Sequence, residues 1–134
     1  MRSRIRSVIP KKIVGINISE DKRQIIEDVA KSENAEAVFF GGKVSAQQVG
    51  WLCGFKGFEQ SDKEGEAIEE ECLIFSGIDG RSLDPILKKL RAKVGSIDLK
   101  AIVTALNQSW TAAELVKELR REHQHMNGGD GDEK

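Results

Sequence analysis

This chain has two cysteines and two histidines, and their spacing fits no familiar active site or metal site. Cys53 and Cys72 lack the C-x-x-C spacing of a redox pair, and no lysine or histidine stands where it would visibly lower the pKa of either thiol. His123 and His125 are two positions apart, so on a helix they project about 200° from each other, whereas a helical metal pair needs a spacing of three or four residues. We therefore expect no catalytic residue, no metal and no cofactor, with both thiols reduced and packed in the core.

The segment Gly41-Gly42-Lys43 has the residue types of a phosphate-binding loop. The Walker A pattern G-x-x-x-x-G-K-[ST] nevertheless fails, because Ala37 stands at the first glycine position and Val44 follows the lysine. Glycine is also the default residue of tight turns. We interpret the segment as a turn before a helix.

Four short apolar runs predict buried strands, because each run is continuous rather than alternating with polar residues. They lie at 13–16, 37–40, 72–75 and 101–103. Between and after these runs the apolar residues recur with the period of a helix, as in the stripe Leu83, Ile86, Leu87, Leu90 and Val94. The order is β-α-β-α-β-α-β-α, and the sequence shows no internal repeat.

This alternation predicts a single α/β domain. We expect a four-stranded, mostly parallel sheet in the flavodoxin-like order 2-1-3-4, with helices on both faces. Ligands of such sheets bind beyond the carboxyl ends of the strands. The residues there are polar but chemically mild, and they include Asn17, Ser19, Gly41, Gly42, Lys43, Ser76, Gly77, Thr104 and Asn107. Within this set we predict Ser76, Gly77, Thr104 and Asn107 as the candidate ligand contacts.

Cap residues mark where the middle two helices are expected to begin. Ser45 with Gln48 has the pattern of a capping box for the second helix. Pro85 belongs in the first turn of the third helix, behind either Asp84 or Ser82 as its cap.

The fourth helix has the clearest start. Thr111 with Glu114 has the pattern of a capping box, and Trp110 and Leu115 then occupy the two positions of a hydrophobic staple. We therefore interpret Trp110, Thr111 and Glu114 as a structural motif that fixes how the chain enters this helix.

Charge is distributed unevenly, although the net charge is −1 at pH 7. We predict a flexible basic arm at 1–11, a single α/β domain at 12–126 with an acidic, mobile surface loop at 55–70, and a disordered acidic tail at 127–134. The chain has no apolar run of the length that spans a bilayer and no pattern of a secretory signal, so we expect a cytoplasmic protein without a membrane partner. Aromatic residues make up 5% of the chain and none lies among the basic residues of the arm or of the third predicted helix, so we do not expect nucleic acid as a partner.

Thr104, Asn107 and Trp110 form a T-x-x-N-x-x-W motif between the last predicted strand and the last predicted helix. With the strand end Ile74-Phe75-Ser76-Gly77 before it, this segment resembles a small bacterial family of unknown function, domain of unknown function 3783. The resemblance covers only the C-terminal half, from Leu73 to about Glu122. It implies an α/β fold and no established activity.

Two functions of different classes fit these observations. The first, which we favour, is a non-catalytic binding or regulatory module, whose acidic loop and basic arm suit a protein partner or self-association. The second is an enzyme or sensor that binds a small polar or phosphorylated ligand at the candidate contacts. A ligand site requires a concave pocket at those contacts, whereas a partner module requires a shallow rim with an exposed apolar patch.

Overall fold

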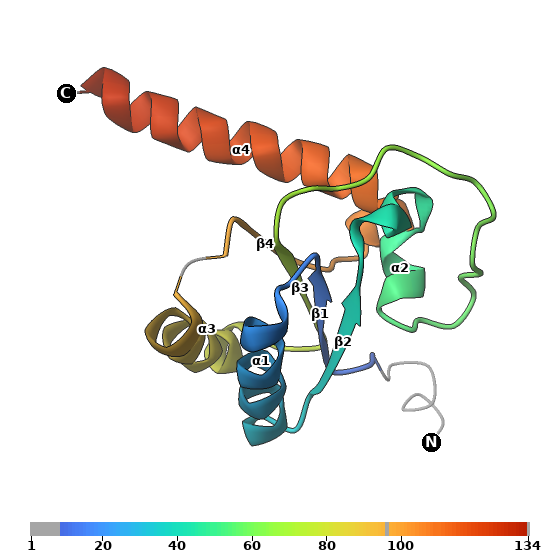
Figure 1. The fold of residues 1–134 in the computed structure, drawn as a ribbon, viewed down its shortest axis with the longest axis horizontal. Coiled ribbons are helices and arrows are strands. Elements are labelled where there is room, and N and C mark those ends of the chain that lie inside the picture. Colours follow the sequence, from blue (N-terminus) through green and yellow to red (C-terminus); the bar gives the residue numbers. More distant parts are fainter. Residues whose placement is uncertain (1–8, 96, 134) are drawn as a thin grey trace.

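The predicted strands form one sheet in a computed structural model, which describes residues 9–95 and 97–133 of the chain (Figure 1). The strands are β1 (Lys12–Ile16), β2 (Glu36–Phe40), β3 (Cys72–Ser76) and β4 (Leu99–Ile102), and their order is β2-β1-β3-β4. β1 pairs in parallel with β2, and β3 pairs in parallel with β4. The predicted order and the mostly parallel pairing are therefore confirmed.

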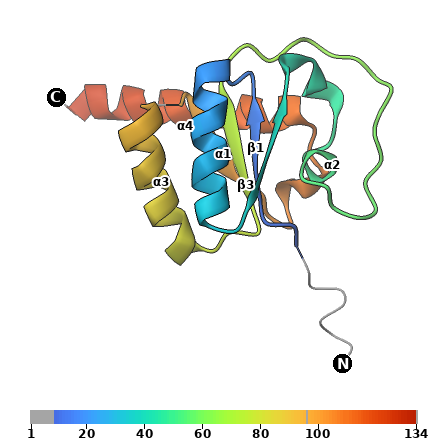
Figure 2. The same ribbon diagram turned by 60° about the horizontal axis from the view of Figure 1, so that its bottom comes forward.

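Helices cover both faces of the sheet, as predicted (Figure 2). The α-helices are α1 (Glu20–Ser32), α2 (Val49–Leu52), α3 (Gly80–Val94) and α4 (Ala112–Glu133), and two short 3-10 helices are η2 (Gly42–Ala46) and η3 (Asn107–Ser109). α1 and α3 lie on one face, and α2 and α4 lie on the other. Within the described residues, no helix is long and apolar enough to cross a membrane.

Each face of the sheet has its own apolar core. Leu73 and Phe75 of β3 are buried on the face of α1 and α3, whereas Val14 of β1 and Ile74 of β3 are buried on the face of α2 and α4. Because β1 and β3 are covered on both faces, every position in them except Lys12 and Ser76 is apolar or glycine. Burial of this kind supplies most of the free energy that holds the layers together.

The central pair of strands is antiparallel. β1 and β3 run in opposite directions, with Val14 opposite Ile74. Alternating strands and helices predict parallel neighbours when each connection is short, but here a long segment separates α2 from β3. This segment lets the chain cross to the other end of the sheet before β3 begins. The carboxyl ends of β1 and β2 therefore lie at one end of the sheet, and those of β3 and β4 lie at the opposite end.

The structure contains an internal repeat, which we did not expect from the sequence. The first unit, β1-α1-β2-η2-α2, has the same order of elements as the second unit, β3-α3-β4-η3-α4. Asn17 after β1 and Gly77 after β3 both have a positive φ, and so do Asn34 after α1 and Gly95 after α3. Buried side chains at equivalent places are partly the same, as with Ile26 of α1 and Ile86 of α3, and partly different, so the similarity between the units is weak at the level of sequence.

The middle helices begin at places that differ from the predictions. α3 begins at Gly80 because the Asp79 carboxylate accepts a hydrogen bond of 2.9 Å from the backbone N–H of Ser82, so Pro85 lies inside the helix rather than in its first turn. Ser45 belongs to η2, and α2 begins after Gln48, so these two residues form no capping box. A 3-10 turn at this point uses the residues that the capping pattern assigned to an α-helix.

The predicted outer segments differ in how far the structure describes them. Residues 1–8 of the basic arm lie outside the described residues. α4 extends to Glu133, and the disordered tail that we predicted at 127–134 stays a prediction. In Figure 1 the C-terminal part of α4 projects beyond the sheet.

Candidate functional site

The antiparallel central pair divides the predicted strand-end residues into two groups. Ser76, Gly77, Thr104 and Asn107 follow β3 and β4, so the structure brings these four candidates to one end of the sheet, which we call the β3/β4 end. The residues that follow β1 and β2, which include Asn17 and the Gly41–Lys43 segment, lie at the opposite end, which we call the β1/β2 end. Our expectation of one common rim was wrong, because β3 runs against β1.

Ser76 and Gly77 contact the segment that precedes β1. The buried Ser76 hydroxyl donates a hydrogen bond of 2.7 Å to the carbonyl oxygen of Pro10. Gly77 has a φ of 68°, and a Cβ at this position would lie 2.6 Å from the same carbonyl oxygen. Glycine is therefore required both by the left-handed backbone and by the close approach of Pro10.

Thr104 and Asn107 close the loop after β4 with their own side chains. The Asn107 Oδ1 atom accepts a hydrogen bond of 2.8 Å from the backbone N–H of Thr104, and its Nδ2 atom donates one of 3.1 Å to the carbonyl oxygen of Ile102. The Thr104 hydroxyl oxygen accepts from the backbone N–H groups of Leu106 and Asn107. The loop therefore uses every polar atom of the Asn107 side chain.

The structural motif at the start of α4 is present. Thr111 Oγ1 accepts a hydrogen bond of 3.1 Å from the backbone N–H of Glu114, and Glu114 Oε1 accepts one of 2.9 Å from the backbone N–H of Thr111. Trp110 and Leu115 belong to the same apolar core, which agrees with a staple. T-x-x-N-x-x-W thus joins a loop closed by its own side chains to a capped helix.

Both cysteines are buried and unpaired. Burial raises the pKa of the Cys72 thiol from 9.0 to about 12, with a smaller contribution in the same direction from the charge of Glu70. Burial also raises the pKa of the Cys53 thiol from 9.0 to about 11, although a hydrogen bond with Ser76 and the charge of Lys12 act in the opposite direction. A thiol nucleophile needs a lowered pKa and access to its substrate, and these two groups have neither.

Apolar side chains are exposed at the β3/β4 end. Within the described part of the chain, the large hydrophobic residues that remain exposed are Ile9 at 56%, Ile102 at 46% and Leu106 at 72%. Ile102 ends β4, Leu106 lies in the loop that follows, and the backbone of Ile9 lies against Gly77. We call these three residues the apolar rim.

The β1/β2 end is covered by the acidic loop. Ile68 in this loop is 4% exposed, its backbone N–H donates a hydrogen bond of 3.0 Å to the carbonyl oxygen of Gly42, and its own carbonyl oxygen accepts one from the Asn17 side chain. A Cβ on Gly42 would overlap this carbonyl oxygen, so a glycine is needed there. The Gln47 side chain holds the loop at a second point, through hydrogen bonds of 2.7 Å to both the backbone N–H and the carbonyl oxygen of Ser61. The loop is therefore anchored at both Ser61 and Ile68.

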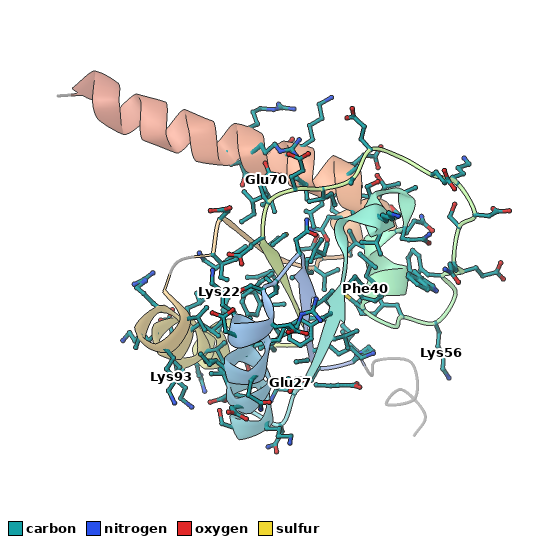
Figure 3. The ribbon with its side chains drawn as sticks, in the orientation of Figure 1. Lys22, Glu27, Phe40, Lys56, Glu70 and Lys93 are labelled. Carbon is teal, nitrogen blue, oxygen red and sulfur yellow. The ribbon has the colours of Figure 1, made fainter. Side chains whose placement is uncertain are left out.

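Two ion pairs fix the acidic residues that follow Ile68. Glu70 accepts two hydrogen bonds from Arg120 of α4, at 2.5 Å and 2.7 Å, and Glu71 lies 2.7 Å from the Lys22 ammonium of α1. The hydrogen bond from Arg120 is the main reason that the pKa of Glu70 is lowered. Figure 3 labels Glu70 where the loop passes α4, and Lys22 on α1. Part of the acidic loop is therefore bound within the protein itself.

Two hollows occur away from the candidate contacts. One, of about 210 Å³, is lined by Trp110, Glu114 and Glu118. The other, of about 170 Å³, lies between α3 and β4 and is lined by Leu73, Leu87, Leu90, Arg91, Gly95, Ile97 and Lys100. Neither hollow includes any of the four candidates. Within the described residues, no group of three or more His, Cys, Asp or Glu side chains could hold a metal ion, and the side chains of His123 and His125 lie outside that description.

Sequence reasoning missed Ile68 and Leu106, and it wrongly placed Ile102 in a buried strand, since Ile102 lies on the exposed part of β4. Ile68 is an apolar residue surrounded by acids in the segment 64–71, which is a signal of an anchor that could have been noticed. Leu106 lies outside every predicted strand and helical stripe, which is a signal of an exposed apolar residue. Their exposures could not be derived, because they depend on the direction of β3.

The fold and the strand ends define an α/β protein with a four-stranded mixed sheet and an apolar rim, in which the side chains of Ser76, Thr104 and Asn107 are occupied by internal hydrogen bonds. Residues 71–126 match the family described as Domain of unknown function (DUF3783), so the resemblance predicted for the C-terminal half is confirmed. The match covers the second unit, from the residue before β3 into α4. No curated protein and no solved structure matches the chain.

Proposed function

We propose that this protein is a non-catalytic binding module that contacts a protein partner through the apolar rim. The observation that carries the proposal is the contrast between polar and apolar groups at the β3/β4 end. Ser76 and Asn107 use their side-chain polar atoms inside the protein, whereas Ile102 and Leu106 beside them are exposed. Exposed large apolar residues that gather at one end of a sheet are typical of a partner surface.

The thiols support a role without catalysis. The pKa of Cys53 and that of Cys72 are both raised by burial, so neither thiol is suited to act as a nucleophile at neutral pH. Buried free thiols also agree with the cytoplasmic location expected from the sequence, because disulfides are rare in a reducing compartment. A cytoplasmic protein partner is part of the proposal.

The partner surface is tested by placing a photoreactive amino acid at position 106. We expect it to capture a partner from an extract of the source cells, and we expect Ile102→Asp to abolish that capture. Lys43 is the matched control, since it lies in η2, which follows β2 as η3 follows β4, and is also exposed. Equal capture from positions 106 and 43, or capture that Ile102→Asp leaves unchanged, would contradict the proposal.

A small polar ligand at the strand ends is the competing function. We expect nucleotides, inorganic phosphate and small carboxylic acids to leave the thermal midpoint of the protein unchanged, because a ligand that binds only the folded state raises it. A rise in midpoint that Asn107→Ala removes would place a ligand at the candidate contacts and overturn the binding-module proposal.

A further inference from the structure

The sheet contact between the two units is symmetric. β1 and β3 are antiparallel about Val14 and Ile74, and the two ends of this pairing join Lys12 with Ser76 and Ile16 with Cys72. Exchanging the two units leaves the register unchanged, because the first residue of each strand faces the last residue of the other. This is the arrangement of an isologous interface between identical subunits.

The face that carries α2 and α4 shows the same symmetry. The backbone N–H of Val49 donates a hydrogen bond of 2.8 Å to the carbonyl oxygen of Trp110, and the N–H of Ala112 donates one of 2.8 Å to that of Gln47. Val49 and Ala112 are the first residues of α2 and α4, and Gln47 and Trp110 lie two positions before them. Each unit therefore gives and receives one equivalent bond.

A single unit leaves a large apolar surface uncovered. Without β1, the strand β3 would lose one neighbour along its whole length while Leu73 and Phe75 face one core and Ile74 faces the other. A two-stranded sheet is marginally stable in water, and an unpaired apolar strand edge favours association. The segment that matches the family, residues 71–126, contains only this half of the sheet.

Whether a unit pairs within its own chain or with a second copy depends on the length and the anchors of the connection between the units. It follows α2, is held at Ser61 and Ile68, and has exposed residues from Asp62 to Ala67. Figure 1 shows that this connection forms a wide loop outside the helices before it returns to β3. Apart from its anchors, this connection does not take part in the contact between β1 and β3.

We infer that the surface by which each unit contacts the other can also bind a second copy of this chain. The first unit of one chain then pairs with the second unit of the other chain. The surface consists of β1 with α1 in the first unit and β3 with α3 in the second. The occupant is a second copy because the interface is already formed by two equivalent units in symmetric register. The inference is independent of the proposed function, since it concerns the centre of the sheet and not the apolar rim.

The test uses two full-length variants, Val14→Pro and Ile74→Pro. Proline in a central strand removes a hydrogen-bond donor of the sheet, so each variant keeps one intact unit and loses the other. We expect an equal mixture to form a 1:1 complex that unfolds cooperatively, since the intact second unit of one chain meets the intact first unit of the other. Light scattering after gel filtration measures the mass. The double variant Val14→Pro/Ile74→Pro is the control, and it should bind neither chain.

A mixture that contains only monomers, or the same association in the double variant, would overturn the inference. A second measurement avoids dependence on damaged strands. A protease site placed in the exposed segment Asp62–Gly65 cuts the wild-type protein between the units. We expect the two pieces to elute together and to unfold at a midpoint that rises with protein concentration, whereas the midpoint of the uncut chain stays constant. Pieces that separate under native conditions would contradict the inference.

Discussion

At the β1/β2 end Ile68 is 4% exposed, and at the β3/β4 end Leu106 is 72% exposed. The two ends are built from equivalent strands, turns and 3-10 helices, so the repeated elements themselves do not produce this difference. It comes from the segment that crosses each end. The acidic loop brings an isoleucine and two paired carboxylates to the β1/β2 end, whereas residues 9–11 contact Ser76 and Gly77 at the other end and leave the apolar rim exposed. A repeated scaffold can therefore close one end and leave the other available to a partner.

The largest expected effect compares the apolar residues of the two ends. Ile68→Ala should lower the free energy of unfolding by about 3 kcal/mol, because it removes buried methyl groups and leaves a cavity. Leu106→Ala should change it by less than about 0.5 kcal/mol, because that side chain is exposed. Urea titration of both variants measures the difference. Equal losses would show that the two ends are covered alike.

The next effect concerns the turn under the acidic loop. Gly42→Ala should lower the free energy of unfolding by about 2 kcal/mol, because the added methyl group would overlap the carbonyl oxygen of Ile68 and displace the loop. Gly41→Ala is the matched control, since nothing lies within 4 Å of its Cβ position. A loss of stability in the control that matches Gly42→Ala would mean that backbone flexibility, not the loop, sets the requirement for glycine.

The thiols at the two ends should make stability depend on alkaline pH. The pKa of Cys53 is about 11 and that of Cys72 about 12 in the folded protein, so each group holds its proton more tightly when folded. The stabilisation is complete below the unfolded pKa near 9.0 and is lost as pH rises toward the folded values. From about pH 8 to pH 10, each thiol should remove roughly 1 kcal/mol from the free energy of unfolding. Urea midpoints of the wild type and of Cys53→Ala/Cys72→Ala at both pH values test this, and an equal decline in the two proteins would exclude the thiols as its cause.

The smallest effect is expected from the ion pair that ties the acidic loop to α4. Arg120→Ala should lower the free energy of unfolding by less than about 1 kcal/mol, because both partners are partly exposed and screened by solvent. The pKa of Glu70 is lowered, so this contribution is present above the unfolded pKa and is lost as the carboxylate protonates at lower pH. A double-mutant cycle with Glu70→Gln isolates the pair. A coupling that exceeds the effect of Ile68→Ala would mean that the ion pair, and not the buried isoleucine, is the main anchor of the loop.

The sequence was sufficient for the parts of the fold that depend on local patterns. Continuous apolar runs identified β1 and β3, and the spacing of Thr111 and Glu114 identified the start of α4, because burial and capping leave traces in neighbouring residues. The direction of β3 could not be predicted, because it depends on how the chain between α2 and β3 crosses the sheet. The candidate site was affected for the same reason: Ser76 and Thr104 lie at the same end of the sheet, but Asn17 lies at the other end.

The antiparallel contact between β1 and β3 also has a consequence for how the chain folds. Lys12 pairs with Glu36 and Cys72 pairs with Leu99, so each parallel pair joins residues that are close in the chain, whereas Val14 and Ile74 are separated by most of a unit and a long connection. Closing the longer loop costs more chain entropy, and contacts between distant residues slow folding. We expect substitutions in the β1–β2 and β3–β4 pairs to change the folding rate and substitutions between β1 and β3 to change mainly the unfolding rate. The centre of the sheet is then the last part of the protein to form, although it is the most deeply buried.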